Sequence, residues 1–470
     1  MFIIWQNGAA QTSGSLIGSV VDEDNLPLPG ANILISDANT GAATDQNGEF
    51  RLSPLSAGDH VVEIMFIGFQ TVRDTVSIRA GHSTTLNVVM ASGIVQLDAV
   101  VVFGERLRGQ AKALNQQKTN FNITNVVSAD QVGRFPDQNI GDALKRIAAI
   151  SVNYNQGEAR YANIRGVGPS LNAVTIDGES AASADAETRA VQLDLIPAEM
   201  VQSIEINKTT TPDMDADAIG GSINLVTRQA PNVRRVSATL GSGYNVLTGK
   251  PMLNGGFVLA QRFFQQKVGL VLSGALDDRR LGSHNTEGIW AFDANGRIYP
   301  KQWDVRLYDI RRLRRSLSVA GDYRLNDNNR FFLNIMLNHR DDWENRVRLR
   351  YRLEPPTKKG VAKNSEIRRQ TKGGPDSNRN KKARLEDQRL SNFQIKGKHN
   401  ISDLFQAEWS VSIGRASEIR PRERYFSWHV KDAPVQVDLA SLRTPLFTDD
   451  TTPNDFTPED ISEEFRNTHD

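Results

Sequence analysis

The second half of the chain, from residue 232 onward, is built from short runs in which apolar and polar residues alternate. In the clearest run every second residue is apolar: Phe405, Ala407, Trp409, Val411 and Ile413. Runs at 317–323 and 331–337 have the same period of two. Because successive side chains of a strand point to opposite faces of a sheet, each run has one apolar face. The pattern predicts either the half-buried sheets of a soluble sandwich or the lipid-facing wall of an antiparallel transmembrane β-barrel.

Length and composition narrow the classes of protein that fit. At 470 residues the chain is long enough for several domains of ~150 residues each. Its 56 Lys and Arg against 55 Asp and Glu leave a net charge of +1, which excludes a polyanion binder that acts through a global positive field. The sequence lacks the ~18–20 consecutive apolar residues of a membrane helix, although a membrane β-strand needs only ~9–11 residues. Because there is no cysteine, disulfide frameworks and thiolate zinc sites are excluded.

Residues 1–13 are expected to be the remnant of a secretory signal peptide. The apolar residues at 2–5 are followed by small residues at 8–10 that resemble a cleavage site. A complete signal would also have a basic start and ~7–15 apolar residues, so a ragged terminus is the alternative.

Residues 14–92 have the strand spacing of a small β-sandwich. Six β-rich runs are separated by Gly-, Pro- and Asn-containing turns: 15–22, 31–36, 49–52, 60–67, 70–78 and 83–89. The segments 29–33, 44–50 and 65–69 resemble, in this order, the carboxypeptidase regulatory-like, transthyretin-like domain, which carries no catalysis. Asp45-Gln46-Asn47-Gly48 has too few ligands for a calcium loop, so we expect a turn with Gly48 at positive φ.

A short apolar strand and a polar linker are expected at 93–120. Residues 97–104 are rich in valine, and residues 105–120 are polar without lasting periodicity. A short strand on a flexible tether is suited to pairing with the sheet edge of a partner protein. The alternative is a last sandwich strand followed by a linker.

Residues 121–231 have the mixed pattern of an α/β domain. After a strand at 123–127, a helix is expected to bury one face, made of Ile140, Ala143, Leu144 and Ile147. A second helix is expected at 195–200 with Pro197 in its first turn. Strands are expected to follow at 201–207 and 222–227.

Five motifs of this domain, in their order, resemble the plug domain of TonB-dependent outer-membrane receptors. They are Phe-Pro-Asp with the helix at 135–147, Asn-Ile-Arg-Gly at 163–166, Thr-Ile-Asp-Gly at 175–178, Val-Gln-Ser-Ile-Glu-Ile at 201–206 and Ala-Ile-Gly-Gly at 218–221. The motif residues are Phe135, Pro136, Asp137, Arg165, Gly166, Asp177, Gly178, Gly220 and Gly221. The Phe-Pro-Asp motif with its Ala-Leu-Lys-Arg-Ile helix is most similar to receptors associated with oligosaccharide uptake.

The resemblance implies a role for the strand ahead of the plug. In such receptors this position holds the TonB box, which here is Asp98, Ala99, Val100, Val101, Val102, Phe103 and Gly104. The segment is similar to the pattern Glu-Val-Val-Val-Thr-Gly, with Phe103 in place of the usual Thr. The resemblance therefore implies that this strand lies in the periplasm and binds TonB, part of the inner-membrane energy-coupling complex.

The resemblance also implies a multidomain fold and a location. It implies a transthyretin-like β-sandwich, an α/β plug and, over 232–470, part of a transmembrane antiparallel β-barrel in the outer membrane of a Gram-negative bacterium. A 22-stranded plugged barrel takes roughly 220 residues in strands alone, whereas residues 233–470 fit about eight to ten strands. We therefore expect a chain that lacks the C-terminal part of the barrel.

The function implied by the resemblance is TonB-dependent active uptake of an oligosaccharide. Ferric-siderophore uptake and a binding-only surface adhesin or signalling receptor are the alternatives. The expected partners are TonB, outer-membrane lipid and a small-molecule or oligosaccharide ligand, and no nucleic acid.

Residues 346–389 form the one strongly basic stretch. They contain 15 Lys and Arg against 5 Asp and Glu. Nucleic-acid binding is disfavoured because Tyr351 is the only aromatic residue available for base stacking. We expect a long solvated surface loop, or alternatively one that faces the anionic outer leaflet or an acidic ligand.

The sequence nominates no catalytic, metal-binding or cofactor-binding residue. The seven His do not form an HExxH motif or another close metal-ligand spacing. The segment after Gly166 is no dinucleotide-binding fingerprint, and there is no Walker loop or GxSxG elbow. We therefore expect a protein that is not an enzyme.

Overall fold

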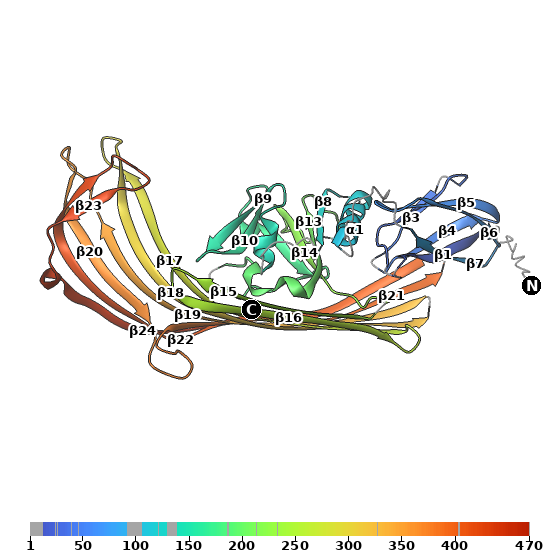
Figure 1. Ribbon diagram of the computed structural model, residues 1–470. Coiled ribbons are helices and arrows are strands. Elements are labelled where there is room, and N and C mark those ends of the chain that lie inside the picture. Colours follow the sequence, from blue (N-terminus) through green and yellow to red (C-terminus); the bar gives the residue numbers. More distant parts are fainter. Residues whose placement is uncertain are drawn as a thin grey trace, which may run out of the picture.

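The computed structural model describes residues 13–469, except 92–105, 129–138 and short gaps at 24, 26, 39, 46, 121, 186–187, 213, 233, 327 and 403–404. Three predicted features lie outside the described residues. They are the expected TonB box at 98–104, the Phe135-Pro136-Asp137 motif and residues 1–12 of the expected signal remnant. Figure 1 shows three parts: an N-terminal sandwich (residues 13–91), a central unit (residues 106–231) and a long curved sheet that we call the wall (residues 235–469). The sandwich and the central unit lie side by side along the wall, which rises beyond the central unit at its far end (Figure 1).

The N-terminal sandwich consists of two small sheets. Its strands are β1 (Ser13–Asp22), β2 (Asn32–Ile35), β3 (Thr40–Ala43), β4 (Glu49–Ser56), β5 (Gly58–Met65), β6 (Val72–Ile78) and β7 (Ser83–Met90). One sheet has the order β4-β1-β7 and the other β3-β2-β5-β6. Leu16, Ile33 and Ile64 are each at most 1% exposed. They belong to a hydrophobic core that is the sandwich's own.

The turn at Asp45 has the expected form. Asp45 Oδ1 accepts hydrogen bonds from the backbone N–H groups of Asn47 and Glu49, at 2.9 and 3.0 Å. Gly48 has a φ of +74°. The carboxylate thus caps a turn, as Asp commonly does.

The prediction of a polar linker at 105–120 is wrong, because most of this segment forms the helix α1 (Arg106–Thr119). Its residues are mainly good helix formers such as Arg, Leu, Gln, Ala and Lys. Tertiary contacts add to this: Ala113 is buried, and Gln116 Nε2 donates to Glu205 Oε1 at 2.5 Å. The backbone N–H of Val126 donates to Gln117 Oε1 at 3.4 Å. The helix is therefore fixed against the central sheet.

The central unit is a five-stranded sheet with a separate hairpin and short helical turns. Its elements are β8 (Thr124–Ser128), α3 (Ile140–Leu144), β9 (Ile150–Asn155), β10 (Glu158–Ile164), η1 (Pro169–Leu171), β11 (Asn172–Ile176), β12 (Glu179–Ser180), η2 (Leu193–Leu195), η3 (Ala198–Met200), β13 (Val201–Asn207) and β14 (Gly221–Thr227). The sheet order is β12-β11-β14-β13-β8, so β8 is an edge strand, and β9 pairs with β10. The four apolar residues expected on one helix face all lie in the core, although α3 itself has only five residues and begins after its N-cap Asn139.

The prediction of a second helix at 195–200 is wrong. Two 3-10 turns, η2 and η3, lie on either side of Ile196 and Pro197 instead. Proline disfavours the α conformation in the residue before it and has no N–H to donate. Pro197 therefore separates the two turns rather than starting one helix.

The wall is a ten-stranded antiparallel sheet of long strands. They are β15 (Arg235–Asn245), β16 (Lys250–Phe263), β17 (Val268–Phe292), β18 (Ile298–Asn326), β19 (Asn329–Arg352), β20 (Val361–Gly373), β21 (Arg384–Ser402), β22 (Phe405–Asp438), β23 (Leu446–Asp449) and β24 (Thr457–His469), with the 3-10 turn η4 (Pro453–Asp455) before β24. Both β20 and β21 lie between β19 and β22, one pairing with each half of these longer strands. Near the sandwich, consecutive strands are joined by connections of only two to four residues, as at 264–267.

The prediction of a long loop at 346–389 is also wrong. The stretch contains the end of β19, all of β20 and the beginning of β21. Its basic side chains are tolerated in strands because many pair with carboxylates on neighbouring strands. Examples are Arg350 with Asp304 at 2.7 Å and Arg352 with Glu366 at 3.0 Å.

The convex face of the wall carries a belt of exposed apolar side chains. On four neighbouring strands, Val319, Ile335, Phe393 and Ile413 lie directly opposite one another. Ile413 is 66% exposed and Leu337 47%. This belt is the apolar face that the alternation predicts. Among the described residues, the helices are all too short or too polar to cross a membrane.

The concave face of the wall holds the central unit and the sandwich. Met336, Leu390 and Ala416 of the wall belong to the same hydrophobic cluster as the core of the central unit. Glu49 of the sandwich pairs with Arg330 and, at 3.4 Å, with Arg324 of the wall. The three parts therefore contact one another directly.

Candidate functional site: the contact between the central unit and the wall

Four of the motif residues that the structure describes occupy tight turns of the central unit. Arg165 and Gly166 follow β10 with φ of +54° and +77°, and Asp177 and Gly178 connect β11 to β12 with φ of +51° and +90°. Backbone conformations of this kind favour Gly and Asp. These residues therefore shape the ends of the strands.

Gly220 and Gly221 are required by close packing. A Cβ atom on Gly220 would lie 2.0 Å from Asn172 Oδ1, and one on Gly221 would lie 2.4 Å from the backbone oxygen of Asn207. Gly221 also has a φ of +139°. Both positions are excluded to larger residues unless the backbone moves.

Asp177 connects the central unit to the wall. Its carboxylate accepts hydrogen bonds from the Thr227 backbone N–H at 2.9 Å and the Thr227 hydroxyl at 2.7 Å. Asn334 of β19 donates to the same carboxylate at 2.9 Å. Burial raises the pKa of Asp177 to about 6, against the opposing effect of the Thr227 hydrogen bonds. Of the motif residues, Asp177 is thus one whose side chain bonds directly to the wall.

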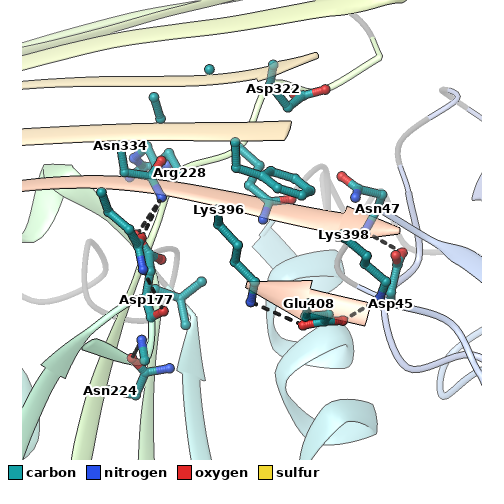
Figure 2. Close-up of a pocket in the computed structure, with 18 residues that line it drawn as sticks. Asp45, Asn47, Asp177, Asn224, Arg228, Asp322, Asn334, Lys396, Lys398 and Glu408 are labelled. Atoms are coloured by element: carbon teal, nitrogen blue, oxygen red, sulfur yellow. Dashed lines mark hydrogen bonds and ion pairs between the residues drawn. The ribbon is translucent and has the colours of Figure 1, made fainter. Parts of the chain in front are cut away.

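A polar cavity of about 350 Å³ lies where the three parts meet. Figure 2 shows its lining, with Asp45 and Asn47 from the sandwich at one side and Asp177 and Asn224 from the central unit at the other. The wall contributes charged and amide side chains: Asp322, Asn334, Gln394, Lys396, Lys398 and Glu408. The cavity lies at the end of the wall that has the tight turns, beneath the central sheet.

Two lysines on β21 share one carboxylate in this cavity. Lys396 and Lys398 lie 3.5 and 3.2 Å from Glu408 (Figure 2). Burial raises the pKa of Asp45 across the cavity, while the positive charges of Arg330 and Lys398 act in the opposite direction. Charged groups of the sandwich and the wall therefore face the same cavity.

A buried ion network forms the main polar contact between the central unit and the wall. Glu158 of β10 is paired with Arg279 at 2.6 Å, with Arg312 at 2.5 Å and with Arg314. Glu158 is 2% exposed. Burial alone would raise the pKa of Glu158, but the three guanidinium groups hold it well below its usual range. The side chain is therefore a carboxylate held by three cations.

A second carboxylate extends the network along the wall. Asp194 of η2 pairs with Arg340 of β19 and lies 4.0 Å from Arg314. Arg340 is also 3.5 Å from Glu386, which lies 3.9 Å from Arg160 of the central unit. Cations and carboxylates alternate through the contact, so the charges are close to balanced.

The ion network could not be read from the sequence. Its wall residues lie in four charged stretches, which are 277–280, 311–315, 340–344 and 384–387. A charged residue at every second position of a strand was the available signal, since such residues share one face. Nothing in the local sequence marks Glu158 or Asp194 as their partners.

One group of side chains has the composition of a metal site. His339 Nε2 lies 3.2 Å from Asp341 and 3.0 Å from Asp387, in the part of the chain that the structure describes. Both carboxylates are also paired with arginines, Asp387 with Arg389 at 3.1 Å and Asp341 with Arg315. The arginines supply the positive charge that a cation would bring, so the group is better described as an ion-pair cluster.

Comparison with known families identifies two domains. Residues 16–102 match the CarboxypepD_reg-like domain, and residues 115–222 match the TonB-dependent Receptor Plug Domain. The first domain corresponds to the sandwich and the residues that follow it, and the second to most of the central unit.

Curated relatives are similar over about half of the chain. The TonB-dependent receptor SusC of Bacteroides thetaiotaomicron is 27% identical over 252 residues, which cover 49% of this chain and 24% of that protein. The TonB-dependent receptor P3 of Formosa agariphila is 26% identical over 249 residues, which cover 50% of this chain and 22% of that protein. The aligned part thus spans about a quarter of the length of these relatives.

Solved structures of siderophore and citrate transporters are more distant. The ferric citrate transporter FecA in its unliganded form is 12% identical, covers 75% of this chain and 62% of its own, and has a TM-score of 0.33. The siderophore receptor PirA from Acinetobacter baumannii is 12% identical, covers 70% of this chain and 60% of its own, and has a TM-score of 0.30. Likeness at this level carries no argument about fold or ligand.

Proposed function

Because this chain carries a CarboxypepD_reg-like domain and the plug domain of TonB-dependent receptors, we propose that it belongs to an outer-membrane receptor that takes up a ligand by TonB-dependent active transport. The observation that carries the proposal is the position of the plug domain. It lies on the concave face of a long antiparallel sheet and is held there by buried ion pairs (Figure 1). A plug in this position blocks the path along the sheet until it is moved.

The wall is proposed to be part of a transmembrane β-barrel. Its convex face has the belt of exposed apolar side chains that lipid contact requires, and most side chains on its concave face are polar or charged. From Phe331 to Leu337 of β19 the belt extends over six residue-to-residue steps, or ~20 Å at ~3.3 Å per step. We propose that the sandwich and the tight turns lie in the periplasm and that the far end of the wall lies outside the cell.

Energy coupling is proposed to act through residues 98–104. This segment precedes α1, which is bonded to β8 and β13 of the central sheet. TonB pairing with the segment would exert a pull whose first point of resistance is α1, and then the edge strand β8. An edge strand pulled from one end separates from its neighbour one hydrogen bond at a time, which requires little force compared with shearing the whole sheet. Transport thus begins with local opening of the plug, without unfolding of the wall.

The ligand is proposed to be an oligosaccharide. This proposal rests on the Phe-Pro-Asp motif at 135–137 and its following helix, which resemble receptors associated with oligosaccharide uptake. The outer membrane has neither ATP nor a sustained ion gradient, so uptake against a gradient has to draw on the inner membrane through TonB.

Deletion of residues 98–104 tests the proposed transport. In cells that express the whole receptor, the deletion should abolish energised uptake of labelled oligosaccharides and leave their binding to the cell surface unchanged. The point variant Val100→Pro should act in the same way, because proline removes a backbone donor of the pairing strand, and Val100→Ile is the matched control. Uptake that is unchanged by both the deletion and Val100→Pro would contradict the proposal and favour a binding-only receptor.

A further inference from the structure

Beyond the central unit, the concave face of the wall carries a second group of arginines. β18 and β19 pair without a register shift from Gln302↔Arg352 to Arg324↔Arg330, so every second residue shares a face. Arg312 and Arg340 face the central unit. The even-numbered residues of β18 and β19 beyond the central unit therefore lie on the same concave face as Arg312 and Arg340.

Six arginines on this face form what we call the outer arginine cluster. Its members are Arg306 of β18, Arg346, Arg348, Arg350 and Arg352 of β19, and Arg368 of β20, which lies opposite Arg350. Arg346 to Arg350 are six to ten positions beyond Arg340, or ~20–33 Å along the strand. The cluster thus lies in the rising part of the wall, near the label β20 in Figure 1.

One carboxylate serves several guanidinium groups in this cluster. Asp304, which is fully buried, lies 2.7 Å from Arg306 and 2.7 Å from Arg350. Arg348 reaches the same carboxylate only at 3.6 Å. Asp304 is therefore shared among three cations.

The remaining carboxylates do not balance the charge. Arg306 also pairs with Glu287, and Arg352 and Arg368 share Glu366, at 3.0 and 2.8 Å. Among the described residues, the ion pairs of these six arginines thus involve three carboxylates, which are Asp304, Glu287 and Glu366. By contrast, the ion network against the central unit alternates positive and negative groups.

Several donors in the outer arginine cluster have no acceptor. Among the described residues, the buried Nε atoms of Arg306, Arg346 and Arg348 have no hydrogen-bond partner. Arg346 is bonded through its Nη2 to the neutral amide of Gln370 at 2.9 Å. Like charges held close together are unfavourable, and buried donors without partners add to the cost. A ligand with negative groups would relieve both.

We propose that the outer arginine cluster recognises an acidic oligosaccharide, with carboxylate or sulfate groups on its sugar rings. This inference rests on the proposed function and names the substrate class of the same transport path. Guanidinium groups bind carboxylate and sulfate through two parallel hydrogen bonds, and a row of arginines at alternate positions presents them ~6–7 Å apart. Such a row fits a chain that carries repeated negative groups better than it fits a neutral sugar.

Binding measured on the purified whole receptor in detergent tests this inference. The probes are a tetrasaccharide of galacturonic acid, a sulfated galactose tetrasaccharide and neutral maltotetraose as the size-matched control. At least one acidic probe should bind at least ten-fold more tightly than maltotetraose, with an affinity that falls as salt is raised. Equal or weaker binding of both acidic probes would overturn the inference, and the stronger of the two identifies the acidic group.

Two variants locate the binding site. Arg348→Gln and Arg350→Gln should each weaken binding of the acidic probe by ten-fold or more. Arg315→Gln, on the convex face of β18 and 44% exposed in its side chain, should leave it unchanged. Unchanged outer-membrane abundance and thermal unfolding of the variants establish that the fold is intact. Acidic-probe binding that is the same in all three variants would also overturn the inference.

Failure of the inference and failure of the proposed function give different results. If the receptor takes up maltotetraose in a manner that requires residues 98–104 and does not bind the acidic probes, transport stands and acidic recognition is wrong. If the acidic probe binds through Arg348 and Arg350 but no ligand is taken up, recognition stands and the transport proposal is wrong.

Discussion

The guanidinium group of Arg279 in the wall donates to the Glu158 carboxylate of the plug domain at 2.6 Å. Both side chains are largely buried, and Arg312 and Arg314 bind the same carboxylate. One plug residue thus pairs with three wall cations on two adjacent strands. This arrangement fixes the plug against the wall through charge, at a contact that the proposed transport would have to break.

Glu158→Gln tests how much this contact contributes. The substitution keeps the size of the side chain but leaves three buried guanidinium groups without their carboxylate. Breaking a buried ion pair in this way costs ~3–5 kcal/mol, so the plug should open more readily. Hydrogen exchange of β9 and β10 amides measures this as faster exchange. The exposed pair of Asp217 with Arg189 supplies the control Asp217→Asn, which should leave exchange unchanged, and equal rates in both variants would argue against a network that holds the plug.

The pH dependence of plug stability should include a contribution from Asp177. Its pKa is about 6 in the folded protein, against ~3.9 for an unfolded Asp. The folded state therefore binds the proton more tightly, so stability should fall by ~2–3 kcal/mol as the pH rises from ~4 to ~6 and then level off. Hydrogen exchange of β11 and β14 across this range checks the sign. In Asp177→Asn this part of the slope should vanish, and a slope that persists unchanged would assign it to other groups.

Gly221→Ala should destabilise the plug, because the new Cβ would lie 2.4 Å from the Asn207 carbonyl oxygen at a φ of +139°. Strain of this kind and overpacking each cost ~1–3 kcal/mol. The matched control is Gly168→Ala, since a Cβ there meets no atom within 4 Å and φ is −59°. Thermal unfolding of the two variants should differ by several degrees, and equal midpoints would contradict the packing described for Gly221.

The sandwich should detach from the wall when the charge at position 49 is reversed by the substitution Glu49→Lys. Glu49→Lys replaces its pairs with Arg330 and Arg324 by repulsion between like charges. Because the chain has no cysteine, spin labels can be attached at Thr75→Cys in the sandwich and Gln406→Cys in the wall. The distance distribution between the labels should broaden and shift to longer values in Glu49→Lys. Glu63→Lys, which affects only a pair within the sandwich with Arg73, should leave it unchanged.

The strands were predictable because their cause is local. In β22, Trp409, Val411 and Ile413 alternate with polar residues, and a period of two has no other regular explanation. The parts of β19 and β20 that carry Arg346 to Lys372 were mistaken for a loop, because the high density of Lys and Arg concealed the alternation of Val347, Leu349 and Tyr351 with arginine in β19. The helix α1 was missed since it lacks an apolar stripe and is held instead by contacts with β8 and β13.

The site was predictable only where backbone conformation restricts the residue type. The motifs that end at Gly166 and Gly178 were recognised from the sequence, and the structure shows that both glycines have positive φ and lie in turns. The ion network was not predicted, because Glu158 and Arg314 are separated by 156 positions and become neighbours only when plug and wall meet. The outer arginine cluster depends likewise on the register of β18 and β19.

Energised uptake by cells is the most direct test of TonB-dependent transport by this receptor. Cells with the whole receptor are given a panel of labelled neutral and acidic oligosaccharides, and internal accumulation is followed with and without an uncoupler that collapses the proton-motive force. At least one probe should accumulate, and this accumulation should stop with the uncoupler and be absent in Val100→Pro, while surface binding continues in both cases. Accumulation that persists with the uncoupler, or that is the same in Val100→Pro as in Val100→Ile, would show that uptake is not driven through residues 98–104.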